Sequence, residues 1–77
     1  MVKPTSVTNS IRSLRFAHGE MTQADLAERI GVTRQTVIAI EQGRYSPSLE
    51  VAFQIARVFD APLDDVFQYP DNRSQTS

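Results

Sequence analysis

The side chains best suited to a chemical role lie close together between residues 33 and 44, and they are hydrogen-bonding groups. Wound at about 100° per residue, as in an α-helix, this segment places Gln35, Ala39 and Gln42 on one face, with Arg34 and Ile38 on its flanks. A glutamine amide pairs bidentately with adenine, a guanidinium pairs with guanine, and an alanine methyl contacts the methyl group of thymine. The pattern therefore fits base edges in a DNA groove. An ordinary solvated helix face in a small bundle would carry similar residues, so the pattern alone leaves both interpretations open.

Other kinds of site find little support. The chain has no cysteine and a single histidine, His18, and its carboxylates do not cluster around that histidine, so we expect neither a disulfide nor a metal site. No nucleophile stands with a base and no phosphate-binding loop is visible, so we expect neither an enzyme nor a cofactor. No apolar run approaches the roughly 20 residues that span a bilayer, and residues 1–5 lack the apolar stretch of a signal peptide. We therefore expect a cytoplasmic protein with no membrane contact.

The charge of the chain is unevenly distributed. The 77 residues fit one small domain, and a hydrophobic fraction of 40% is enough for one core. A net charge of −1 by itself argues against a nucleic-acid partner, but residues 1–44 carry +2 and residues 45–77 carry −3. Because local sign matters more than the total for contact with phosphates, the first half of the chain is the candidate for facing DNA.

The elements that position these residues are expected to be helices, because apolar residues recur at helical spacing between residues 9 and 69. We expect five helices, over about 9–18, 23–30, 34–42, 49–59 and 63–67. A hydroxyl oxygen can accept a hydrogen bond from the exposed backbone at a helix start. The expected N-caps are Thr22, Thr33 and Ser48. Glycine tolerates the left-handed conformation at a helix end. The expected C-terminal stops are Gly19, Gly31 and Gly43.

Burial and chain ends follow from the same spacing. The fourth helix is expected to bury Leu49, Ala52, Ile55, Ala56 and Phe59. The first is expected to bury one face with Ile11, Leu14 and either Ala17 or His18. Residues 1–8 are expected to be a flexible arm before the domain over residues 9–69. Residues 70–77 have almost nothing to bury and are expected to be a disordered tail.

The connection at residues 30–33 points to a particular motif. Two short helices joined by three or four residues that include a glycine are the signature of a helix-turn-helix. Ala27 is small enough for the two helices to approach closely, and Val32, Val37 and Ile40 supply an apolar seam between them. We therefore predict an all-α, compact five-helix fold with a helix-turn-helix formed by the second and third helices.

Residues 21–44 strongly resemble the Cro/repressor (Xre-type) helix-turn-helix family. The shared motif is Thr-Gln-x-x-Leu-Ala, then Gly-Val-Thr-x-Gln-Thr, then Ile-Glu-x-Gly, and the resemblance extends over about residues 9–69. It implies a lambda-repressor-like fold and a transcriptional regulator that binds double-stranded DNA. The third helix would lie in the major groove.

The resemblance also implies a role for each matched residue. The residues implied to read bases are Arg34, Gln35, Ile38 and Ala39. The residues implied to contact phosphate are Gln23, Thr33, Thr36, Gln42 and Arg44. A salt bridge between Arg15 and Glu41 is implied to join the first helix to the third. Ile38, Gln42 and Pro62 depart from the usual residues of the family, so the operator sequence stays undetermined.

A domain of this size covers about one half-site, so a palindromic operator requires a homodimer. Surplus apolar residues near the C-terminus predict an isologous contact. Its expected residues are Leu63, Val66, Phe67 and Tyr69, with Phe53 as a further candidate.

Two related functions stay open. One is an antitoxin that binds a small protein partner and autoregulates its operon, and the other is a restriction–modification controller of similar fold and size. The sequence does not distinguish activation from repression and names neither the regulated genes nor an effector.

Overall fold

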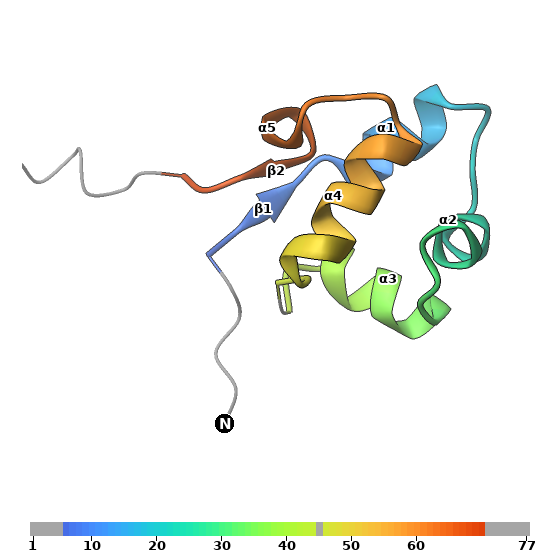
Figure 1. Cartoon of the computed structure of the whole chain (residues 1–77), viewed down its shortest axis with the longest axis horizontal. Coiled ribbons are helices and arrows are strands. Elements are labelled where there is room, and N and C mark those ends of the chain that lie inside the picture. The colour runs from blue at the N-terminus through green and yellow to red at the C-terminus, as the bar shows by residue number, and fades with distance from the viewer. Residues whose placement is uncertain (1–5, 45, 71–77) are drawn as a thin grey trace, which may run out of the picture.

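The computed structural model describes residues 6–44 and 46–70, and it confirms the predicted five-helix fold (Figure 1). The helices are α1 (Ile11–Ala17), α2 (Gln23–Ile30), α3 (Arg34–Glu41), α4 (Leu49–Val58) and α5 (Leu63–Val66). Helix α2 and helix α3 are joined by residues 31–33, as expected for a helix-turn-helix. In the described part of the chain, no helix is long and apolar enough to cross a membrane.

The three predicted N-caps are confirmed. The hydroxyl of Thr22 accepts the backbone N–H of Asp25 at 3.0 Å, and the Asp25 carboxylate accepts the backbone N–H of Thr22 at 3.3 Å, which completes a capping box at the start of α2. Thr33 and Ser48 cap α3 and α4 by accepting a backbone N–H three residues further on, each at 3.2 Å. These local hydrogen bonds define where each helix begins.

The three longest helices end in the same way. The residue after the last turn takes a left-handed conformation, with φ of 73° at Gly31 after α2, 72° at Gly43 after α3 and 51° at Asp60 after α4. After α4, the backbone N–H of Ala61 donates to the carbonyl of Ala56 at 3.0 Å, which is the long hydrogen bond of a Schellman motif. Asp60 thus occupies the place that glycine takes in the other two helices.

A short antiparallel ladder joins the two ends of the described chain (Figure 1). Strand β1 (Thr8–Asn9) pairs with β2 (Phe67–Gln68), with Thr8 opposite Gln68 and Asn9 opposite Phe67. The sequence predicted no strand here, because two residues are too few to show alternation. As a result, Asn9 is not the start of the first helix, and Thr8 of the expected arm is paired. Residues 1–5 and 71–77, which hold most of the expected arm and tail, lie outside the described residues.

The core is formed mainly by aliphatic side chains from all five helices. Its buried members are Ile11, Met21, Leu26, Ala27, Ile30, Val37, Ile40, Ile55, Ala56, Phe59 and Val66. The prediction that Leu49 is buried is wrong, because its side chain is 68% exposed. Leu49 is the first residue of α4, and side chains on a helix tilt toward its N-terminus, so Leu49 points past the domain. Ala17 and His18 are also exposed, because α1 ends there and the chain turns away.

The prediction that Val66 belongs to a dimer contact is contradicted by its burial. Its side chain is 0% exposed within the core, so no second chain can touch it while the fold is intact. Leu63 and Phe67 are partly buried and pack against the same core. Helix α5 is therefore used mainly to close this domain, although sequence reasoning assigned it little core to cover.

Asp60 generates a test of the helix ends. A non-glycine residue in the left-handed region is strained, and a carboxylate beside a helix C-terminus opposes the helix dipole. Asp60→Gly removes both of these costs, and their removal outweighs the greater conformational freedom that glycine has in the unfolded chain. We therefore expect this variant to be more stable by about 0.5–1 kcal/mol, which raises Tm by roughly 2–8 °C. Circular dichroism melts at a fixed protein concentration measure this shift. Asp60→Ala is the control and should melt below the parent protein, and a glycine variant that melts below it too would contradict the argument.

Candidate nucleic-acid interface

Helix α3 is anchored on one side and open on the other. Val37 and Ile40 are buried in the core and fix the inner face of the helix. Three polar side chains are exposed on the outer part: Arg34, Gln35 and Gln42. Three further residues are half-buried along its flanks: Thr36, Ile38 and Ala39. The outer face therefore presents two amides and a guanidinium on a helix whose position is held by packing.

A carboxylate at the end of α3 joins three helices. Glu41 Oε2 accepts a hydrogen bond from Arg15 Nε at 2.7 Å, and Glu41 Oε1 accepts one from Arg15 Nη2 at 3.1 Å, so the ion pair is bidentate. Gln23 Nε2 at the start of α2 donates to Glu41 Oε1 at 3.2 Å. Arg15 Nη1 also donates to the carbonyl of Met21 at 2.8 Å. The ion pair that the family resemblance implied is thus present, and it includes α2 as well as α1 and α3.

Asn9 holds the C-terminal end of α3 from the other side. Its Nδ2 donates to the carbonyl of Ile40 at 2.9 Å, and its Oδ1 accepts the backbone N–H of Ile11 at 3.1 Å. The same carbonyl accepts the backbone N–H of Gly43 at 3.0 Å, so the Asn9 amide adds a second hydrogen bond and joins the residues before α1 to the end of α3. Sequence reasoning assigned Asn9 to a helix start and missed this bond, because the two residues are 31 positions apart.

A shallow hollow lies between α1, the start of α2 and α3. It brings together three predicted DNA-contacting residues, Gln23, Arg34 and Gln42. Arg12 lines the same hollow and was not predicted, since its direction depends on where α1 begins. Its guanidinium lies 5.6 Å from the centroid of the Phe16 ring, within cation–π range. The only sequence signal for Arg12 was its place among the bases of residues 1–44.

The two ends of α3 hold the remaining predicted residues. At the start, the hydroxyls of Thr33 and Thr36 are 3.0 Å apart. At the end, the backbone N–H of Arg44 donates to the carbonyl of Ala39 at 3.0 Å, and Gly43 supplies the left-handed turn. Helix α3 has eight residues and is about 12 Å long at a rise of 1.5 Å per residue, so the exposed Arg44 lies at the opposite end of the helix from Thr33. The predicted dimer residues do not form one surface with each other, because Val66 is buried whereas Tyr69 is exposed.

Comparison with known proteins gives a consistent picture. A family model described as helix-turn-helix matches residues 11–66. A protein named as an uncharacterized HTH-type transcriptional regulator of Methanocaldococcus jannaschii is 48% identical over 64 residues, which cover 83% of this chain and 96% of that protein. A similarly named protein of Bacillus subtilis is 48% identical over 59 residues, or 77% of this chain and 88% of that protein. A crystal structure from Bacteroides fragilis shares the fold, with a TM-score of 0.70 over 80% of this chain and 98% of that chain at 21% identity.

The buried ion pair predicts a large effect of removing one partner. Arg15 and Glu41 are each 9% exposed at the side chain. Glu41→Ala should leave the arginine charge desolvated and lower the free energy of unfolding by about 3 kcal/mol. A loss of this size is a large fraction of the stability of a small domain. Urea unfolding followed by circular dichroism measures it, with Glu28→Ala as an exposed acidic control on α2. If the two variants lose equal stability, the ion pair does not hold the helices together.

Proposed function

The chain belongs to the helix-turn-helix family, in its Cro/repressor (Xre) type, and from this premise we propose that it is a sequence-specific regulator of transcription that binds double-stranded DNA. The observation that carries the proposal is the outer face of α3, where Arg34, Gln35 and Gln42 are exposed on a helix anchored by its buried side. The second helix of a helix-turn-helix enters the major groove. There the Gln35 amide can pair with adenine and the Arg34 guanidinium with guanine, while Ala39 and Ile38 offer apolar contacts to thymine methyls.

Phosphate contacts would hold α3 in register. The exposed guanidinium of Arg44 follows the end of α3, the exposed amide of Gln42 lies at its C-terminal end, and Arg12 lines the adjoining hollow. The hydroxyls of Thr33 and Thr36 lie at the start of the helix. We propose that these groups contact the backbones on either side of the groove, because phosphate contacts fix orientation whereas base contacts give specificity.

Gln23 combines a structural bond with a proposed phosphate contact. Because an ionised carboxylate only accepts hydrogen bonds, the Glu41 carboxylate requires the amide nitrogen of Gln23 to face it. That nitrogen carries two hydrogens, so the second remains able to donate to a phosphate oxygen. In this proposal, Glu41 orients the amide before DNA arrives, and the same carboxylate holds α1 and α3.

A homodimer on a palindromic operator completes the proposal. One domain presents one recognition helix, and a second copy related by a two-fold axis would place another about 34–36 Å away in the next major groove. The names of the Methanocaldococcus and Bacillus relatives support regulation of transcription. A regulator of this kind acts on the chromosome, so we propose the cytoplasm as its location.

The first test concerns specificity. Gln35→Ala should weaken binding to the cognate site by about 1–3 kcal/mol and should leave binding to random DNA nearly unchanged, because the lost contact is to a base edge. The cognate site is selected from a randomised duplex pool, and both affinities are titrated at one salt concentration. Gln68→Ala on β2 is the amide control, since Gln68 lies outside α3 and outside the hollows beside α4, and it should change neither affinity. Equal weakening of Gln35→Ala on both DNAs would remove Gln35 as a base reader.

The second test concerns the phosphate contacts. Arg44→Ala should weaken binding to all DNA sequences alike and lower the slope of log affinity against log salt by about one unit, because one cation fewer releases counterions. Gln23→Ala is the matched comparison and should weaken binding without changing that slope, since a neutral amide releases none. Binding titrations at four or more salt concentrations separate the two. An unchanged slope for Arg44→Ala would place Arg44 outside the interface.

A further inference from the structure

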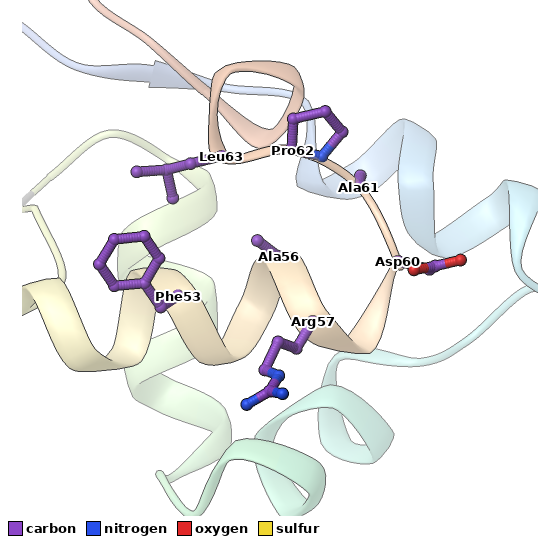
Figure 2. A pocket seen from close by; sticks show the side chains of 7 residues that line it. All are labelled: Phe53, Ala56, Arg57, Asp60, Ala61, Pro62 and Leu63. Carbon is purple, nitrogen blue, oxygen red and sulfur yellow. The ribbon is translucent and has the colours of Figure 1, made fainter.

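The outer face of α4 carries large apolar side chains that the described chain does not cover. Leu49 is 68% exposed and Phe53 is 50% exposed. With Arg57 they recur every four residues and so lie along one side of the helix. Two neighbouring hollows share Phe53 and Arg57, and one of them continues to Leu63 beyond the end of α4. Figure 2 shows the Phe53 ring and the Leu63 side chain facing each other on one side of Ala56.

The charges on this face identify what can cover it. Glu50 lies in the first turn of α4 and Arg57 in the last. They are seven residues apart, which is close to two helical turns or about 10.5 Å, so they share a face. Among residues 6–44 and 46–70, neither takes part in an ion pair. This face thus has an acid at one end, a base at the other and an aromatic ring midway. When two copies of it meet with their helices antiparallel, each acid lies opposite a base and the two rings lie opposite each other.

We propose that α4 is the contact between two copies of this chain, packed antiparallel across a two-fold axis beside Phe53. This inference rests on the homodimer of the proposed function and assigns its surface. The axis places Glu50 of each copy opposite Arg57 of the other, and it brings the two Phe53 rings together with Leu49 and Leu63 around them. An isologous contact of this kind requires each group to meet its counterpart from the same patch.

The proposed contact leaves the DNA-facing residues open. None of the residues that line the α4 hollows also lines the hollow beside α2 and α3. The region that follows α4 is acidic, with exposed Asp60, Asp64 and Asp65, and this charge repels phosphates. Two of the residues predicted for the dimer contact lie outside this face. Tyr69 is exposed but follows β2, and Phe67 is partly buried because it packs against the core of its own domain. Helix α4 therefore replaces the segment around residues 63–69 as the centre of the contact, with Leu63 retained at its edge.

Sedimentation equilibrium without DNA tests the surface. We expect the parent protein to form dimers and Phe53→Asp to raise the dimer Kd at least about thirtyfold, as the loss of a central aromatic contact does. Phe16→Asp on α1 is the matched control, since Phe16 is 53% exposed, and it should leave the dimer Kd unchanged. A Phe53→Asp variant that dimerises like the parent protein overturns the proposal, as does a dimer that only Tyr69→Asp disrupts. A parent protein that stays monomeric at every concentration overturns it as well.

A charge exchange tests the antiparallel register and does not depend on Phe53. Glu50→Arg and Arg57→Glu should each weaken the dimer, because each places like charges opposite one another across the axis. The double variant should recover most of the parent affinity, since it restores both pairs with their signs reversed. Both residues are exposed, and circular dichroism confirms that each variant is folded. A double variant no better than the single ones overturns the register.

Binding to a single half-site separates this inference from the proposed function. Phe53→Asp should bind a half-site like the parent protein and should lose affinity only for the full palindrome. If the parent protein dimerises through α4 but binds no duplex DNA, the DNA-binding function fails and the α4 contact stands. If it binds half-sites well while α4 variants dimerise normally, the function stands and the α4 contact fails.

Discussion

The position of α3 depends on one buried carboxylate. Glu41 accepts two hydrogen bonds from the guanidinium of Arg15 and one from the amide of Gln23, so one side chain connects α3 to both preceding helices. A charge removed from water is tolerated only when its partners are in place, and a partly satisfied network costs more than an apolar core. Every described buried side-chain nitrogen and oxygen has a hydrogen-bond partner. The network thus favours one arrangement of the three helices over others that aliphatic packing alone would allow.

The features that the sequence predicted best are those determined by neighbouring residues. Hydroxyl caps at Thr22, Thr33 and Ser48 act over three residues, and the helix-turn-helix follows from two of those caps with Gly31 between them. These signals predicted five helices and the outer face of α3, including the exposure of Gln35 and Gln42.

The features that were missed depend on contacts between distant parts of the chain. The ladder between Thr8 and Gln68 and the bond from Asn9 to α3 each join residues far apart in sequence. Val66 sits on a four-residue helix whose buried side cannot be deduced from so short a period, and only its docking shows that it belongs to the core. Leu49 was mispredicted for a different reason: helical spacing placed it correctly on α4, but it could not show that the side chain of the first helical residue points past the domain.

The pairing of β1 with β2 places the entry and the exit of the described chain side by side, at the end of the molecule away from α2 (Figure 1). A dye, an affinity tag or a solid support attached beyond either end would therefore extend from the same edge of the domain. Pulling on both ends at once would load the ladder hydrogen bonds one after another, as a zipper opens, before it strained the helices. The domain can thus be immobilised or joined to another protein through either end from one edge.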